Sequence, residues 1–279
     1  MIIHIPDLKT RNPIISIALE ESLAFYYSKV EDFTALLRFW FNPPSIILGR
    51  SCKVLENINS EVLIALHNKQ KKFLKDKNIC LVRRLSGGGT VYHTYGNLNY
   101  TFIIPLKKYP EFFSIPNSYN IILNFLIKAL KKQNIEALIQ GLSDLVIETK
   151  EGYKKFSGNS QFRKYHMLVH HGTLILQKNV IEEVQKILKH PPKEPDYRMK
   201  RSHEDFLTTL PKEFDISLFY ESLLEQLQDY FQQDQIRFVN YSESKELRKI
   251  LIDKVKNVYS SSEWIYQGKY TQKEIILDF

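Results

Sequence analysis

Short runs of apolar residues recur along the 279-residue chain and predict strands of a sheet. Each run is rich in β-branched and aromatic side chains, which pack well on a pleated surface. An Asn-Pro-Pro turn at 42–44 separates two of these runs. The predicted strands are residues 1–5, 34–41, 45–48, 79–82, 100–104, 135–139 and 145–147, together with an alternating segment at 153–176.

Longer segments repeat apolar residues at intervals of three and four, which is the spacing of one helix face. In the segment 110–133, for example, Ile122, Phe125 and Leu126 share such a face. For the first helix we predict Ser16 as the N-cap, with Glu20 and Glu21 on the solvated surface. The predicted helices are residues 16–26, 61–77, 110–133, 180–188, 217–232 and 242–258.

The order of these elements predicts the fold class. Strands with interspersed helices come first and helices dominate the end of the chain, which favours an α+β fold with helices packed on mixed, largely antiparallel sheets. No internal repeat, low-complexity tract or sharp change in composition marks a boundary between domains. We therefore expect a single domain over residues 1–279, in which the part from about 196 to 279 is mainly helical.

Composition and charge narrow the class of partner. Hydrophobic residues make up 43% of the chain and aromatic residues 13%, which is enough for a packed core. The 39 Lys and Arg exceed the 31 Asp and Glu by 8, so an anionic ligand or an acidic protein is favoured. No nucleic-acid-binding signature accompanies this charge, and no apolar run approaches the length of a membrane span. We expect neither nucleic acid nor a membrane as a partner.

One stretch, residues 81–104, concentrates residue types that bind anions: LVRRLSGGGTVYHTYGNLNYTFII. Its Gly87–Gly89 run uses three of only ten glycines, and backbone amides without a neighbouring Cβ can approach a ligand closely. Arg83 and Arg84 add positive charge suited to carboxylate or phosphate oxygens. The alternative is a plain hairpin with a glycine-rich turn. No Gly-Lys-Ser/Thr follows, so the loop is not a Walker A motif.

A second dense patch, residues 153–176, contains a candidate functional lysine. Lys155 stands among strand residues beside Ser157 and Gly158, where its ammonium can point into a pocket. The neighbouring Lys154 illustrates the alternative, because most lysines simply extend to water.

The histidines and cysteines do not form a metal-binding pattern. His170 and His171 are adjacent, and neighbours in a strand face opposite sides, so two ligands to one metal are not expected. His93 is a candidate general base or, equally, a hydrogen-bonded structural residue. Cys52 and Cys80 match neither a disulfide framework nor a zinc site.

Taken together, these motifs resemble the lipoate–protein ligase A family, within the wider group of biotin and lipoate ligases. The resemblance covers nearly the whole chain in the family's order. It rests on Arg-Arg-Leu-Ser-Gly-Gly-Gly-Thr-Val-Tyr-His at 83–93, Gly-Asn-Leu-Asn at 96–99, Lys-Phe-Ser-Gly at 155–158 and His-Gly-Thr at 171–173, with weaker matches at 18–21, 49–50 and 262–264.

The resemblance implies a biotin/lipoate ligase-like catalytic domain that performs a two-step acyl transfer. In the first step ATP and Mg²⁺ convert lipoate to lipoyl-AMP with loss of pyrophosphate. In the second, a lysine amine of a carrier domain attacks this mixed anhydride and forms an amide. The implied carriers are lipoyl domains of 2-oxoacid dehydrogenase E2 subunits and the glycine-cleavage H protein.

The family's functional positions fall in both dense patches. Lys155 is implied as the catalytic residue, bridging the lipoate carboxylate and the α-phosphate. Arg84 is implied to hold phosphate or carboxylate oxygens. Asp144 is implied at the Mg²⁺–phosphate end, although Ser143 replaces the family's usual Asn. The remaining substrate- and nucleotide-binding positions implied by the resemblance are Ser86, Gly87, Gly88, Gly89, His93, Asn97, Ser157, Gly158, His171, Gly172 and Thr173.

Two departures from the family's pattern bear on the reaction. Octanoyl- and lipoyl-transferase relatives form a thioester on a cysteine upstream of the lysine, and residues 135–143 contain none. This favours an ATP-dependent ligase over an ATP-independent transferase or a lipoate-binding relative without catalysis. Longer family members also continue into a C-terminal accessory domain, which is expected to be lacking here. Either a separate accessory polypeptide supplies it, or only part of the reaction runs unaided.

The start of the chain bears on its compartment. It has no basic segment followed by an apolar one, so we expect a cytoplasmic protein, or an organellar matrix protein in a eukaryote. Lipoate, octanoate and biotin all stay open as the acyl group, because the choice depends on which side chains face the pocket.

Overall fold

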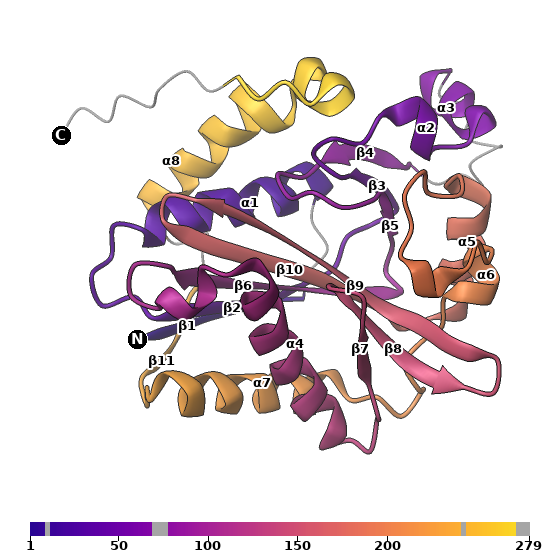
Figure 1. Cartoon of the computed structure of the whole chain (residues 1–279). Helices are drawn as coiled ribbons and strands as arrows, with labels where there is room; N and C mark the ends of the chain where they lie inside the picture. The colour runs from indigo at the N-terminus through magenta and orange to yellow at the C-terminus, as the bar shows by residue number, and fades with distance from the viewer. Residues whose placement is uncertain (9–11, 69–77, 241–243, 272–279) are drawn as a thin grey trace.

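Two sheets make up the centre of the protein (Figure 1). The computed structural model describes residues 1–8, 12–68, 78–240 and 244–271. The strands are β1 Ile2–Asp7, β2 Ala35–Trp40, β3 Ser45–Leu48, β4 Cys80–Arg83, β5 Val91–His93, β6 Asn97–Pro105, β7 Leu138–Gln140, β8 Asp144–Thr149, β9 Gly152–Lys164, β10 Met167–Ile175 and β11 Ile236–Phe238. They form a large sheet in the order β11-β1-β2-β6-β10-β9-β8-β7 and a small sheet in the order β4-β3-β5.

Helices cover both faces of the large sheet, with α4 and α7 on one side and α1 and α8 on the other (Figure 1). In the large sheet β1 runs parallel to β2 and β11, and the other pairs are antiparallel. The predicted α+β fold with a largely antiparallel sheet is confirmed. The helices are α1 Pro13–Tyr27, α2 Val54–Asn57, α3 Ser60–His67, α4 Ile115–Lys131, α5 Lys178–Ile187, α6 His203–Phe206, α7 Ile216–Phe231 and α8 Lys245–Lys254.

The central strand β6 is buried along nearly its whole length. Side chains of Leu98, Tyr100 and Phe102 enter the core beneath α4 and α7, whereas Ile103 enters the core beneath α1 and α8. Because both faces of the strand are covered, its polar residues Asn97, Asn99 and Thr101 are buried as well. Among the described helices, none is long and apolar enough to cross a membrane.

Several predicted helix boundaries are corrected by local capping. Helix α1 begins at Pro13, not Ser16, because the side chain of Asn12 accepts a hydrogen bond from the amide of Ile14 and proline suits the first turn. Helix α4 begins at Ile115, not Pro110, with Ser114 as its N-cap. Residues 110–112 instead form a 3₁₀ turn. Helix α3 ends at 67, and the rest of the predicted helix 61–77 is largely outside the described residues.

The strands around the glycine run do not form a hairpin with each other. Strand β3 lies between β4 and β5, parallel to the first and antiparallel to the second. The Asn-Pro-Pro segment at 42–44 therefore carries the chain from the large sheet, where β2 lies, to the small sheet. As a result the Gly87–Gly89 segment connects two outer strands of the small sheet.

The C-terminal part is mainly helical among the described residues, with β11 as a short strand between α7 and α8. Helix α8 continues into a π-helical turn at 255–259, and a second such turn covers 263–267. Both turns pack near α1 and β4.

Glu21 ties this C-terminal segment to α1, and the prediction that Glu20 and Glu21 are solvated is wrong. Both side chains are at most 1% exposed. The Glu21 carboxylate accepts hydrogen bonds from Lys164, Lys254 and Tyr259 at 2.6, 2.9 and 3.0 Å. Burial alone would raise the pKa of Glu21, but the two ammonium groups lower it to about 2.

We expect Glu21→Gln to destabilise the protein by about 3 kcal/mol or more, because the buried Lys254 and the partly exposed Lys164 would lose their counter-charge. The folded-state pKa of Glu21 lies below the ordinary value of 4.5. Its contribution is therefore complete above about pH 4.5 and is lost as the pH falls toward about 2. Urea unfolding of both proteins at several pH values measures this. The exposed helix residue Glu61 supplies the control, Glu61→Gln, and an equal loss there would contradict the assignment.

Candidate active site

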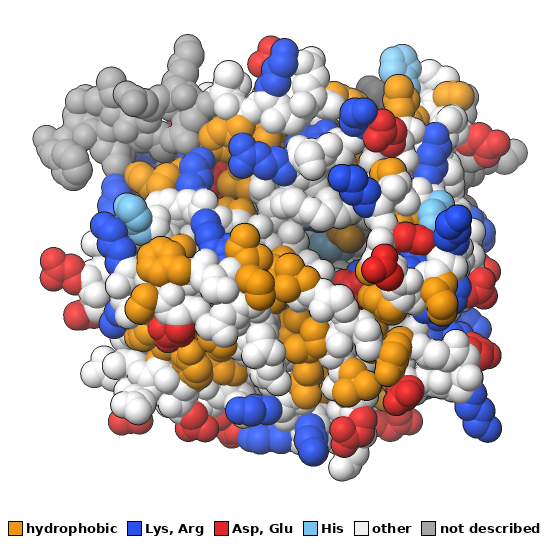
Figure 2. Space-filling model, viewed as in Figure 1, with side chains coloured by type: hydrophobic (Ala, Val, Ile, Leu, Met, Phe, Trp, Pro, Cys, Tyr) orange, Lys and Arg blue, Asp and Glu red, His pale blue; other side chains and the backbone are white. Residues whose placement is uncertain are grey.

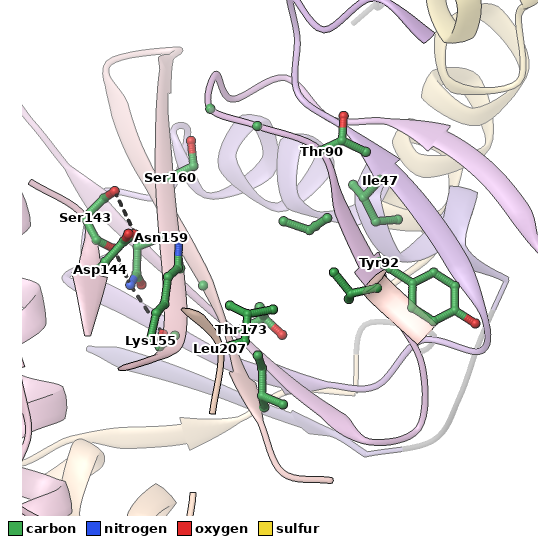
Figure 3. A pocket seen from close by; sticks show the side chains of 18 of the residues that line it. Ile47, Thr90, Tyr92, Ser143, Asp144, Lys155, Asn159, Ser160, Thr173 and Leu207 are labelled. Carbon is green, nitrogen blue, oxygen red and sulfur yellow. Dashed lines mark hydrogen bonds and ion pairs between the residues drawn. The ribbon is translucent and has the colours of Figure 1, made fainter. Parts of the chain in front are cut away.

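A cavity of about 330 Å³ lies between the large sheet and the small sheet, with α5 and the segment 191–207 closing one side. Figure 2 shows the surface hollowed near the centre of the view. The two dense patches of the sequence meet here. Figure 3 shows Ser143, Asp144, Lys155 and Asn159 together on one side of the cavity, with Ile47 and Tyr92 across from them.

Lys155 on β9 points its ammonium group to the carboxylate at the start of β8. Its Nζ lies 2.8 Å from Oδ1 of Asp144, and the hydroxyl of Tyr197 donates to Oδ2 of the same carboxylate at 2.8 Å. The lysine side chain crosses directly over Gly158, where an added Cβ would stand 2.9 Å from Nζ. Only glycine at 158 leaves room for this position of the ammonium group.

Asn159 holds the loop that presents Asp144. Its backbone amide and its Nδ2 both donate to the carbonyl oxygen of Ser143, at 3.0 and 2.9 Å. Its Oδ1 accepts a hydrogen bond from the hydroxyl of Tyr100. The amide side chain therefore fixes the backbone next to the Lys155–Asp144 pair.

Arg84 is buried under the glycine segment and anchors it. One terminal nitrogen donates to the carbonyls of both Gly87 and Gly89 at 2.7 Å, and Nε donates to the hydroxyl of Ser86 at 2.9 Å. Gly88 adopts a φ of +81°, which glycine alone adopts without strain. The guanidinium thus shapes the loop, in addition to the anion-binding role that the resemblance implies.

Arg83 points to the opposite side of β4, away from the cavity between the two sheets. It donates to the carbonyls of Gly49, Arg50 and Cys52 through one terminal nitrogen, at 2.8 to 2.9 Å. Its Nε donates to the carbonyl of Trp264 at 2.8 Å. Arg83 therefore connects the segment 49–52, which follows β3, to the C-terminal turn at 263–267.

A chain of hydrogen bonds runs from the glycine segment into α1. Ser86 Oγ lies 2.7 Å from Nε2 of His171, and Nδ1 of His171 lies 2.7 Å from Oε2 of Glu20. The other carboxylate oxygen accepts from Thr101 at 2.7 Å. Burial alone would raise the pKa of Glu20, but the charge and hydrogen bond of His171 outweigh it, so the pKa lies below its ordinary value. The chain orients His171 at the cavity wall.

Two further histidines of the dense patches, His93 and His170, are buried and neutral. Burial lowers the pKa of His93 to about 3, and Nδ2 of Asn42 lies 3.2 Å from its Nδ1. Burial also lowers the pKa of His170, which lies 2.9 Å from Gln161. His170 and His171 have separate partners, as expected for strand neighbours.

Most residues implied by the resemblance lie around this one cavity. Those on its wall are Arg84, Gly88, Gly89, His93, Asn97, Asp144, Lys155, Ser157, Gly158, His171, Gly172 and Thr173. Ser86 and Gly87 are not on the wall and lie behind it, bonded to Arg84. Sequence reasoning missed Trp40, Asn99 and Tyr197. Asn99 is the last residue of the Gly-Asn-Leu-Asn motif at 96–99. No pattern in the sequence indicated Tyr197, which reaches Asp144 from 53 residues away.

The architecture matches solved structures of lipoate ligases. A structure described as a bi-partite lipoate protein ligase of Thermoplasma acidophilum and its E2 lipoyl domain aligns with a TM-score of 0.75 and 18% identity, covering 99% of this chain and 98% of the other. A lipoate-protein ligase A bound with ATP aligns with a TM-score of 0.69 and 17% identity, covering 95% and 98%. The chain therefore has the fold of these lipoate ligase structures.

The sequence comparison extends this from fold to family. Residues 12–232 match the model of the lipoyl protein ligase A/B catalytic domain, and the chain belongs to this family. A lipoate-protein ligase of Bacillus subtilis is 32% identical over 187 residues, which are 67% of this chain and 49% of that protein. Lipoate–protein ligase 1 of Staphylococcus aureus is 30% identical over 184 residues, 65% and 48% of the two. The chain spans about half the length of these curated relatives.

We expect Arg84→Lys to loosen the glycine segment. An ammonium group is a single point charge and cannot serve several acceptors spread along the loop. Stability should fall by about 2 kcal/mol, and the backbone order parameters of Gly87–Gly89 measured by NMR should fall. Arg50→Lys, at an exposed arginine, is the matched control. Unchanged order parameters in Arg84→Lys would show that the loop holds its shape without the guanidinium.

Proposed function

We propose that this chain is an ATP-dependent lipoate–protein ligase, which forms lipoyl-AMP and transfers the lipoyl group to a lysine of a carrier domain. The observation that carries the proposal is the ammonium group of Lys155 inside the cavity, beside Asp144 and across from the glycine segment. Family membership supports the same reaction class.

Lys155 carries the first step. Its ammonium has three donors and lies on the cavity wall, so it can bind a carboxylate oxygen of lipoate and an oxygen of the α-phosphate together. The lipoate carboxylate attacks the α-phosphorus and pyrophosphate leaves, giving a mixed anhydride. Lys155 stabilises the negative charge that builds on the α-phosphate during attack. The glycine segment, shaped by Arg84, allows close approach of backbone amides to the adenylate.

Asp144 is the residue that would hold Mg²⁺. No group of three or more acidic, histidine or cysteine side chains that could hold a metal occurs among the described residues. A single carboxylate nevertheless fits the way Mg²⁺ binds in nucleotide sites, through one or two carboxylates together with substrate phosphates. When bound, the metal would offset phosphate charge. Asp144 would also keep Lys155 in place, and Tyr197 and Asn159 orient the carboxylate for both tasks.

The second step needs a carrier lysine to reach the acyl carbon. Its amine attacks the mixed anhydride, the amide bond forms and AMP leaves, while the amine loses its proton. Lys155 stays close to the departing phosphate and stabilises its charge. No cysteine is among the described residues on the cavity wall, so a thioester on the enzyme has no nucleophile there.

The carriers that we propose are lipoyl domains of 2-oxoacid dehydrogenase E2 subunits and the glycine-cleavage H protein. The archaeal structural neighbour, described together with its E2 lipoyl domain, supports the first of these. That neighbour is also described as bi-partite, which supports the alternative that a separate accessory polypeptide assists a catalytic domain formed by residues 1–279. We place the reaction in the cytoplasm, or in an organellar matrix in a eukaryote.

Lipoate-dependent exchange of pyrophosphate into ATP is the test of this function. The reaction should require lipoate and the intact first step, and it does not require a carrier. If exchange is absent and an acyl group is instead transferred from an octanoylated carrier without ATP, the chain is a transferase and the proposal is wrong.

We expect Lys155→Ala to lower the exchange rate at least about 10³-fold, because one essential electrostatic contact to the developing charge is lost. The melting temperature should change little, since the side chain is partly exposed. Lys154→Ala is the matched control: this neighbour pairs with Glu151 outside the cavity. Near-normal exchange in Lys155→Ala would remove the residue from the reaction.

We expect Asp144→Asn to raise the Mg²⁺ concentration needed for half-maximal exchange by about tenfold or more, since an amide is a much weaker ligand for a hard cation. Titrating Mg²⁺ at fixed ATP measures this. Glu151→Gln, at an exposed partner of Lys154, is the control for loss of one negative charge. An unchanged Mg²⁺ requirement would place the metal elsewhere.

A further inference from the structure

The segment that closes one side of the cavity brings an arginine, Arg198, to the wall. The residue before it, Tyr197, donates its hydroxyl to Asp144 at 2.8 Å. Farther along the same segment, Leu207 forms an isolated β-bridge with Lys155, and Figure 3 shows these two residues side by side. The segment is thus attached to both members of the Lys155–Asp144 pair, and Arg198 lies between the two attachments.

Several contacts hold the guanidinium of Arg198 in one position. Nε donates to the carbonyl of Arg201 at 3.1 Å and lies 3.3 Å from Oε2 of Glu194. Nη2 lies 3.5 Å from Nδ1 of His203, and the guanidinium carbon stacks on the ring of Phe206 at 4.7 Å from its centroid. A group that is fixed in this way loses little conformational freedom when it binds a ligand.

The remaining nitrogen, Nη1 of Arg198, has no hydrogen-bond partner among the described residues. It does not belong to the fully buried polar atoms that lack a partner, so it keeps accessible surface. Because Arg198 lines the cavity, a bound molecule can reach this nitrogen. Arg84, the other arginine on the described wall, differs, because all three of its nitrogens already donate to Ser86, Ile47 and the glycine segment.

The charge on this part of the wall favours a ligand with several negative charges. Lys155, Lys193 and Arg198 are the cations there, and the only acidic residue that the described part of the wall contains is Asp144. His203 adds no charge, because burial lowers its pKa. A guanidinium binds phosphate oxygens through paired N–H donors, whereas an ammonium group acts as a point charge. Adjoining phosphates therefore fit this set of groups better than a single carboxylate does.

We propose that Arg198 binds the β- and γ-phosphates of ATP and holds the pyrophosphate as it leaves. The inference rests on the proposed function, in which Lys155 binds the α-phosphate. When an oxygen of the lipoate carboxylate attacks the α-phosphorus, the bond from that phosphorus to the bridging oxygen breaks and pyrophosphate keeps the electron pair. Lys155 stays at the α-phosphate, and Arg198 stabilises the charge that collects on the leaving group.

Equilibrium binding of ATP, AMP and inorganic pyrophosphate to the full chain, with Mg²⁺ present throughout, tests the inference. In Arg198→Met we expect the dissociation constants of ATP and pyrophosphate to rise at least about tenfold, because a charge-assisted contact is lost. The dissociation constant of AMP, which lacks the β- and γ-phosphates, should be nearly unchanged. In the exchange reaction of this variant the KM for pyrophosphate should rise, whereas the KM for lipoate should not.

Lys200→Met is the matched control, since it removes one positive charge from an exposed residue of the same segment that does not line the cavity. Its affinities for all three ligands should equal those of the unaltered protein. Arg198→Lys covers the case in which Arg198→Met does not fold. It keeps the charge but not the paired donors, so it should weaken ATP binding in part and leave AMP binding unchanged.

Equal weakening of ATP and AMP in the Arg198 variants would show that this residue only supports the fold of the segment. Unchanged ATP binding in these variants, or a similar loss in Lys200→Met, would show that Arg198 makes no specific contact with the phosphates. Each of these results overturns the inference while the ligase function stands. If the unaltered protein binds neither ATP nor pyrophosphate, the proposed function fails with it.

Discussion

The guanidinium of Arg84 is the contact on which the cavity depends. It is 6% exposed and bonds to the carbonyls of Gly87 and Gly89, so one buried cation sets the shape of the loop. The next residue back, Arg83, faces the other side of β4 and bonds to Gly49 and Trp264. Adjacent residues of an extended chain point to opposite sides. One arginine therefore shapes the cavity wall, and its neighbour holds the C-terminal turn at 263–267.

The same division of tasks occurs in α1. Glu20 accepts a hydrogen bond from Thr101 and contacts His171 on the cavity wall, whereas Glu21 pairs with the lysines that hold the C-terminal turns. Each buried carboxylate is compensated by several donors, which is what makes its burial tolerable. The cavity wall and the C-terminal segment are therefore tied to α1 through adjacent residues. Removing either carboxylate should therefore destabilise the element to which it is bonded.

Much of the fold could be predicted from local patterns. Apolar periodicity located β3, β4 and α7 closely, and the Gly87–Gly89 run and Lys155 indicated the two halves of the site. Helix starts were less accurate, because a single cap such as Asn12 outweighs the apolar pattern. Glu20 and Glu21 were misplaced on the surface, since their burial depends on partners up to 249 residues away.

Spacing, motif and resemblance were sufficient to recognise the family and the residues around its cavity, because those signals are contained in short segments. The sequence alone could not reveal strand register, that is, which residues lie opposite one another on neighbouring strands. Asp144 and Trp40 line the same cavity only through the register of the strands that lie between them, β9, β10 and β6. The direction of each arginine and the contact of Tyr197 with Asp144 likewise depend on long-range packing. Local chemistry indicates which groups can act, and the folded sheet sets the distances between them.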